Sequence, residues 1–223
     1  MSGPLRLILD IDGTLLDSVA VHERAFDAAL AAGGLPTVAQ WGGVIEHYTD
    51  GWVFSAIYQR VHQCKPEPAQ AAAFEAHFYD AFMAETADGL PQAVPGAAAF
   101  LSALRPRSDI AAAFATGSFG AVANAKLQCF GEVVRELPLI SSTGFSTRES
   151  IVASALRCLP GDGPVVLVGD GQWDRRVARQ SAAAFVGINF SGVPDSGVEN
   201  ECYFPDFSDT PAVLAALTSF GRA

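Results

Sequence analysis

Short apolar runs and longer helix-like stretches alternate along this chain. The runs at 5–9 (LRLIL), 110–115 (IAAAFA), 164–168 (PVVLV) and 184–188 (AFVGI) are nearly continuous, which is typical of short buried strands. A further short strand is expected at 133–134. Strands that alternate with helices predict a parallel sheet with helices on both faces, so we expect an α/β fold.

The segment after the first strand breaks this alternation. Helical patterns occupy 17–32, 38–47 and 53–63, and a longer one opens near Pro68, while no convincing strand appears before Leu90. Such a block between two strands indicates an insertion. We therefore expect a core formed by residues 1–15 and 91–223, and a helical cap formed by residues 16–90.

The charge balance limits the partners that we expect. Asp and Glu number 24 against 14 Lys and Arg, a formal net charge of -10. An acidic surface repels nucleic acid and anionic lipid, so neither is an expected partner. The four cysteines are scattered without a CxxC pair, which excludes zinc spacing and favours reduced thiols in a cytoplasmic protein. A monomer and a homodimer are both compatible with the sequence.

Polar residues follow three of the predicted strands. Asp10 and Asp12 come after the first, Thr116 and Gly117 after the second, and Asp170 after a later one. Ligand sites in open parallel sheets lie at the carboxyl ends of strands. We therefore expect these segments to meet at one site.

The carboxylates at such a site would repel one another. Asp10, Asp12, Asp170 and Asp174 would lie close together, and like charges this near need a neutralising partner. Oxygen ligands without nitrogen or sulfur favour Mg²⁺, which can also bind a phosphate oxygen. The hydroxyl and backbone N–H groups around Thr116 offer hydrogen bonds to a second phosphate oxygen.

Three of these segments resemble motifs of the haloacid dehalogenase (HAD) superfamily. The segment 10–18 (DIDGTLLDS) resembles its first motif, Thr116-Gly117 its second, and 169–174 (GDGQWD) its fourth. Order and spacing extend the resemblance over nearly the whole chain, most closely to phosphoglycolate-phosphatase-like enzymes. It implies a HAD-like, Rossmann-like core with a helical cap inserted after the first strand.

The third motif departs from the common pattern. The family most often carries a lysine shortly before the fourth strand, whereas this chain has Arg148 there. An arginine supplies charge and bidentate contact, but not the geometry of an ammonium. Lys126, in the helix after the second motif, is the alternative, although a packing or surface role suits it better. We expect Arg148 to be the cation of the site.

The resemblance also implies a role for each residue. Asp10 would attack phosphorus to form an aspartyl phosphate, and Asp12 would act as general acid and then general base. Asp10, Asp12, Thr116 and Arg148 form the expected catalytic set. The expected substrate-binding residues are Gly13, Thr116, Gly117 and Arg148, and the expected Mg²⁺ ligands are Asp10, Asp12, Asp170 and Asp174.

Asp12 discriminates between the reactions of this family. Dehalogenases and most phosphonatases lack an aspartate two residues after the nucleophile, whereas an alcohol leaving group requires a proton donor. The sequence therefore predicts a Mg²⁺-dependent phosphatase of a small phosphorylated metabolite. A phosphomutase, which shares Asp12, and a catalytically silent HAD-fold binding protein are the alternatives.

Some polar residues are expected to be structural. The four histidines all lie in the expected cap without the spacing of a metal site, so each is assigned to packing or to the surface. Ser118 is expected to cap the helix that follows it. The segment 47–51 (HYTDG) resembles a cap segment near the site of some HAD phosphatases, and a polar turn between helices fits it equally well.

Overall fold

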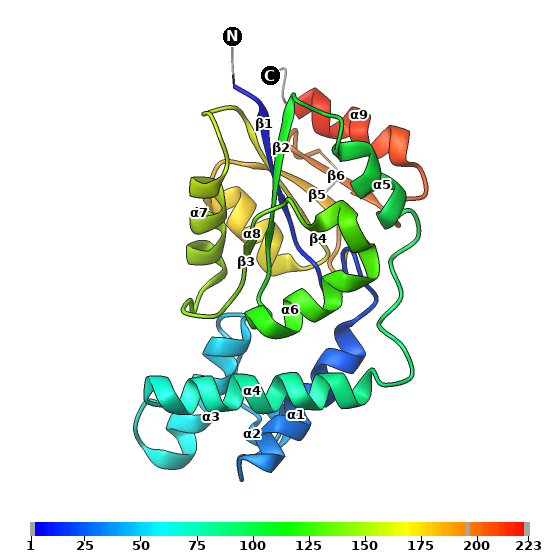
Figure 1. The fold of residues 1–223 in the computed structure, drawn as a ribbon. Helices are drawn as coiled ribbons and strands as arrows, with labels where there is room; N and C mark the ends of the chain where they lie inside the picture. The colour runs from blue at the N-terminus through cyan, green and yellow to red at the C-terminus, as the bar shows by residue number, and fades with distance from the viewer. Residues whose placement is uncertain (1–2, 195–196, 221–223) are drawn as a thin grey trace.

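A six-stranded parallel sheet forms the centre of the computed structural model, which describes residues 3–194 and 197–220 (Figure 1). Its strands are β1 (Leu5–Leu9), β2 (Ile110–Ala115), β3 (Leu139–Ile140), β4 (Val165–Gly169), β5 (Ala184–Ile188) and β6 (Glu201–Phe204). They lie in the order β3-β2-β1-β4-β5-β6, and every neighbouring pair is parallel. The predicted α/β class is confirmed.

The first strand occupies the middle of the sheet, between β2 and β4. Leu9 pairs with Phe114 on one side and with Val168 on the other. The three strands therefore end at nearly the same level, and the residues that follow them meet at one edge of the sheet. Along β1 the side chains alternate, with Leu7 and Leu9 in one buried cluster and Ile8 in another.

Helices cover both faces of the sheet (Figure 1). The first cluster is completed by α5 (Ala97–Leu104) and α9 (Thr210–Phe220), and the second by α7 (Arg148–Cys158) and α8 (Gln172–Gln180). Apolar side chains on both faces explain why the strand sequences are almost continuously apolar. Within the described part of the chain, no helix is both long and apolar enough to cross a bilayer.

Residues 19–85 form a helical segment at the carboxyl end of the sheet (Figure 1). Its helices are α1 (Val19–Ala32), α2 (Val38–Trp41), α3 (Asp50–His62) and α4 (Pro68–Glu85). They share an aromatic cluster in which the rings of Phe54 and Phe74 stack with their centroids 4.1 Å apart. The domain bounds predicted above stay a prediction, and the terminal residues 1–2 and 221–223 of the expected core lie outside the described residues.

The helix α6 (Gly120–Leu127) packs against both parts of the molecule. Ala123 and Leu127 belong to the cluster of β1, whereas Val122 and Ala125 belong to the aromatic cluster of the helical segment. The side chains of α6 therefore pack between the sheet and the helical segment formed by residues 19–85.

Some elements differ from those predicted. Residues 133–134 belong to a 3₁₀ helix, η1 (Gln128–Val134), so the strand predicted there is wrong. The predicted helix 38–47 ends at Trp41, because Gly42 adopts the left-handed conformation with φ 61° and ends α2. β6 was missed because its half-buried edge sequence (ECYF) lacks a continuous apolar run.

Gly96 gives a direct test of the packing between α5 and the segment before α9. It has φ 78°, and a Cβ placed on it would lie 2.2 Å from the carbonyl oxygen of Phe207. Gly34 has a similar φ of 69° but no atom within 4 Å of the same position. We expect Gly96→Ala to lower the free energy of unfolding by about 3 kcal/mol and Gly34→Ala by about 1 kcal/mol, measured by urea denaturation. Equal losses would contradict the close approach.

Candidate active site

Three buried carboxylates meet at the carboxyl edge of the sheet. Asp10 follows β1, Asp170 follows β4, and Asp174 lies in the first turn of α8. One carboxylate oxygen of each lies within 4.8 Å of the other two, and the residues are 3%, 8% and 7% exposed. The sheet thus brings together residues that are far apart in the sequence, as the strand-end pattern predicts.

Gly13 allows the Asp170 carboxylate to lie against the loop after β1. Its φ is 77°, and a Cβ would lie 2.2 Å from Oδ2 of Asp170. The hydroxyl of Thr14 is 3.4 Å from the other oxygen of Asp170 and donates to it. Any side chain at position 13 would therefore displace Asp170. This contact explains through packing why residue 13 is a glycine, and the substrate-binding role expected for Gly13 stays a prediction.

The electrostatics of the three carboxylates favour a bound proton or a cation among them. Burial raises the pKa of Asp10 and of Asp174, and burial with the neighbouring charge of Asp10 raises the pKa of Asp170 to about 7. Oδ2 of Asp10 is buried, and none of the described residues gives it a hydrogen bond. A buried oxygen without a donor, among oxygen ligands only, fits a hard divalent cation such as Mg²⁺.

Arg148 is the cation that contacts this cluster. Its Nη1 donates to Oδ1 of Asp10 at 2.8 Å and lies 3.6 Å from Oδ1 of Asp174. The residue begins α7, where the side chain of Thr147 caps the helix, and it is 7% exposed. Of the two basic residues considered from the sequence, Arg148 is thus the one beside Asp10. One guanidinium cannot balance three carboxylates, which leaves an excess of negative charge.

Lys126 lies beside Asp12, away from this cluster. Its Nζ is 2.6 Å from Oδ1 of Asp12, and the residue is fully buried. Burial raises the pKa of Asp12, but the charge of Lys126 and the hydrogen bonds from Lys126 and Ser18 outweigh burial and hold that pKa well below its usual range. The packing or surface role expected for Lys126 is therefore incomplete, since its ammonium makes an ion pair.

Two serines hold the Asp12 carboxylate as well. The hydroxyl of Ser18 donates to Oδ1, and that of Ser118 donates to Oδ2 at 2.8 Å. The N-cap of α6 is Phe119 and carries no side-chain cap bond, so the capping role predicted for Ser118 is wrong. The N–H of Phe119 instead donates to Oδ2 of Asp50 at 2.8 Å.

The helical segment reaches the site through His22. Its ring Nδ1 lies 2.7 Å from Nζ of Lys126, and its Nε2 lies 3.0 Å from Oδ1 of Asp50. His22 also packs against the rings of Phe26 and Phe78, as its assignment to packing expects, so the polar contacts are what the sequence reasoning missed. A histidine four positions past the first motif, at the start of α1, was the available signal, but the sequence does not show that α1 begins at the site.

The segment 48–50 contacts two loops that flank the cluster. The backbone oxygen of Tyr48 accepts from Nε of Arg148 at 3.2 Å, and the N–H of Asp50 donates to the oxygen of Gly117 at 2.8 Å. A Cβ on Gly117 would lie 2.4 Å from the Tyr48 oxygen, so a glycine is required there. Thr116 is fully buried beside it, and its Oγ1 accepts from the N–H of Ser118.

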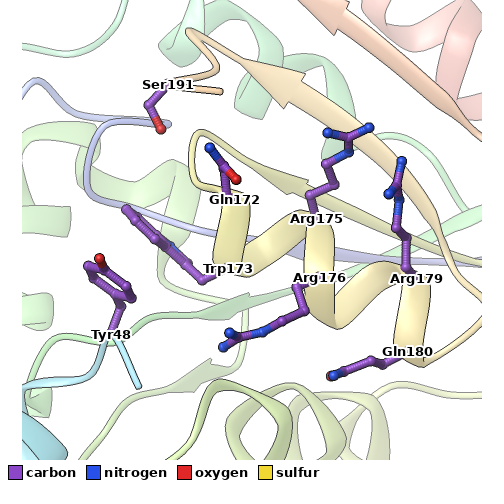
Figure 2. Close-up of a pocket in the computed structure, with 8 residues that line it drawn as sticks. All are labelled: Tyr48, Gln172, Trp173, Arg175, Arg176, Arg179, Gln180 and Ser191. Atoms are coloured by element: carbon purple, nitrogen blue, oxygen red, sulfur yellow. The ribbon is translucent and has the colours of Figure 1, made fainter. Parts of the chain in front are cut away.

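A cavity of about 600 Å³ lies next to the site, along α8. At the edge of this cavity the ring of Tyr48 lies beside Trp173 (Figure 2). The two rings stack, with their centroids 4.3 Å apart. The cavity lining includes aromatic rings and arginines of α8, of which Arg175 and Arg179 pair with Glu201. The lining residues are Tyr48, Gln172, Trp173, Arg175, Arg176, Arg179, Gln180 and Ser191.

The model of the haloacid dehalogenase-like hydrolase family matches residues 6–181. This range contains Asp10, Asp12, Lys126, Arg148 and the acidic pair Asp170 and Asp174. The chain therefore belongs to the haloacid dehalogenase-like hydrolases, and the predicted family, HAD-like fold and hydrolase class are confirmed.

Solved structures share this fold over nearly the whole chain. A hydrolase from Pseudomonas syringae is 21% identical, with a TM-score of 0.70 over 96% of this chain and 98% of its own. CbbY from Rhodobacter sphaeroides, solved in complex with phosphate, is 22% identical, with a TM-score of 0.70 and the same coverage. A predicted phosphoglycolate phosphatase from Haemophilus somnus is 17% identical, with a TM-score of 0.62 over 96% of this chain and 99% of its own. No curated protein matches the chain.

The raised pKa of Asp170 predicts how Mg²⁺ affects stability. Between pH 3.8 and about 7 the folded protein keeps a proton on Asp170 that the unfolded chain has released, so raising the pH favours unfolding without metal. Mg²⁺ binds the deprotonated carboxylate. We expect Mg²⁺ to raise the melting temperature more at pH 8 than at pH 5, measured by differential scanning fluorimetry.

The matched controls are Asp170→Asn, which should lose most of this Mg²⁺ effect, and Asp88→Asn at an exposed position, which should keep it. A Mg²⁺ effect that is equal at both pH values, or unchanged in Asp170→Asn, would contradict a metal site at these carboxylates.

Proposed function

We propose that this protein is a Mg²⁺-dependent phosphatase that hydrolyses a small phosphorylated metabolite through an aspartyl phosphate on Asp10. The observation that carries the proposal is the state of the Asp10 carboxylate. One oxygen accepts from Arg148, while the other is buried beside Asp170 and Asp174 with no donor among the described residues. A carboxylate held at one oxygen and unpaired at the other is suited to metal binding and nucleophilic attack.

Mg²⁺ would be held by Asp10, Asp170, Asp174 and the backbone carbonyl of Asp12, and when bound it would neutralise the carboxylates and polarise a phosphoryl oxygen. Arg148 holds the Asp10 carboxylate and offers charge to a second phosphoryl oxygen. The hydroxyl of Thr116 and the backbone N–H of Gly117 serve the remaining oxygen, so negative charge is stabilised as it spreads in the transition state.

Asp12 acts as general acid and then as general base. Because Lys126 holds its pKa low, Asp12 must take up a proton before it protonates the departing alcohol, and it afterwards removes a proton from the water that hydrolyses the aspartyl phosphate. Only Ile11 separates Asp12 from Asp10 just beyond the end of β1, so the two carboxylates lie close enough for the charge of Asp12 to act on Asp10. Its side chain keeps 17% exposure, whereas Asp10 is buried more deeply, so Asp12 is the more accessible to a leaving group.

The substrate is small because the helical segment lies over the site. Its contacts through Tyr48, Thr49 and Asp50 to the loops after β2 and before α7 leave little space for a macromolecule. These contacts would also limit the access of water during the first step, while the aspartyl phosphate forms. The phosphate in the CbbY structure supports a phosphorylated substrate for this chain as well.

The test is phosphate release from p-nitrophenyl phosphate with Mg²⁺ and with EDTA. We expect EDTA to abolish turnover, and Asp10→Asn to reduce kcat by about 10³-fold or more, because the amide cannot act as a nucleophile. Asp17→Asn, at an exposed position in the same motif, is the matched control and should keep full activity. Asp10→Asn with wild-type turnover would refute the mechanism.

A phosphomutase would respond differently in the same assay. It would release little phosphate from the simple ester, and its turnover of a sugar phosphate would depend on a bisphosphate activator. Wild-type protein without turnover on esters or metabolites, which also fails to bind beryllofluoride at Asp10, would indicate a catalytically silent protein.

A further inference from the structure

Lys126 is one of two lysines in the chain and has no exposed surface. A buried ammonium loses its hydration, so it requires acceptors around it. Its three N–H donors meet three acceptors, namely Oδ1 of Asp12 at 2.6 Å, Oγ of Ser118 at 2.8 Å and Nδ1 of His22 at 2.7 Å. The hydrogen-bonding capacity of the ammonium is thus completely used.

We propose that Lys126 is a positioning residue, which orients the Asp12 carboxylate for proton transfer to and from the leaving group. The inference deepens the proposed function and rests on it. It also separates the two buried cations, since Arg148 serves the nucleophile Asp10 and Lys126 serves the acid–base residue.

The hydrogen bonds around Asp12 fix both of its oxygens. Oδ1 accepts from Lys126 and from the Ser18 hydroxyl, which uses both of its lone pairs. Oδ2 accepts from Ser118, which in turn accepts from Lys126, so the ammonium holds one oxygen directly and the other through the hydroxyl. Without such contacts, the torsion angle that rotates an aspartate carboxylate takes a broad range of values. These contacts select one orientation and leave a lone pair of Oδ2 for the transferred proton.

His22 holds the other side of Lys126. An ammonium only donates, so Nδ1 of His22 is an acceptor, and the ring hydrogen lies on Nε2, which donates to Oδ1 of Asp50. Oδ2 of Asp50 accepts from the N–H of Phe119 at the start of α6. The helical segment thereby keeps the ammonium directed at Asp12, and both ends of this chain of contacts return to α6.

A purely structural counter-charge would make the same contacts, so the test must depend on proton transfer. Protonation by Asp12 matters for an alkyl phosphate, whose alcohol leaves poorly, and matters little for p-nitrophenyl phosphate, whose phenolate leaves without a proton. The ratio kcat/KM includes only the steps up to departure of the leaving group. It therefore excludes the later hydrolysis of the aspartyl phosphate.

The first measurement compares kcat/KM of wild type and Lys126→Met on p-nitrophenyl phosphate and on the alkyl phosphate that wild type hydrolyses fastest. We expect a loss of about 10²–10³-fold on the alkyl ester and less than about 10-fold on the nitrophenyl ester. Lys65→Met makes the same chemical change at an exposed position and should alter neither. Equal losses on the two esters, or no loss on either, would overturn the proposal.

The second measurement is a double-mutant cycle with Asp12→Asn on kcat for p-nitrophenyl phosphate, because kcat, unlike kcat/KM, includes the hydrolysis of the aspartyl phosphate in which Asp12 acts as a base. If Lys126 acts through Asp12, Lys126→Met should lower the rate by a smaller factor in the Asp12→Asn protein than in wild type. The difference should exceed the deviation expected for independent sites. Fully multiplicative losses would show that Lys126 acts elsewhere. Circular dichroism reports folding, and Lys126→Gln replaces Lys126→Met if the methionine variant does not fold.

The outcomes distinguish this inference from the proposed function. Wild-type protein that hydrolyses no ester overturns both. A different outcome rejects the positioning role alone and retains the phosphatase. In that outcome wild-type turnover requires Asp10 and Mg²⁺, and Lys126→Met lowers kcat/KM equally on the two esters.

Discussion

The structure depends on holding three carboxylates within one small buried volume. Asp10, Asp170 and Asp174 come from the ends of β1 and β4 and from the start of α8, where the parallel strands leave backbone loops close together. Their mutual repulsion opposes folding, and the single guanidinium of Arg148 reduces it only in part. A cation that binds these carboxylates in the folded protein would reduce the repulsion and so stabilise the fold.

The neighbouring charges are organised as two separate pairs. Arg148 lies with the nucleophile candidate Asp10, and Lys126 lies with Asp12, although Asp10 and Asp12 are only two residues apart. With the cations apart, the two carboxylates have opposite pKa shifts, since burial raises the pKa of Asp10 while Lys126 holds the pKa of Asp12 low. Both cations are also contacted by the helical segment, through the Tyr48 backbone and through His22.

The sequence was sufficient for the four central strands β1, β2, β4 and β5 and for the residues that follow them, because apolar runs mark buried strands and parallel strands end at one edge; the short edge strands β3 and β6 were missed. Asp10 and Asp170 could be placed in this way, whereas Arg148 was expected from the family resemblance. The contacts of Lys126, His22 and Ser118 could not, since they depend on the rotation of α6 and α1 about their axes and on how these helices meet. The last two residues of η1, 133–134, were predicted as a strand because two adjacent valines carry β propensity, which the surrounding turns overrode.

The two-sided packing of α6 has a consequence for engineered chimeras of this family. One way to transfer substrate specificity between relatives would be to exchange the helices between β1 and α5 and to keep the rest of the chain unchanged. In this chain an incoming insert would need to supply a histidine acceptor for Lys126 and apolar partners for Val122 and Ala125. Grafting would therefore require either an insert that carries these groups or the exchange of α6 together with the insert, and in the second case the transferable unit extends past β2.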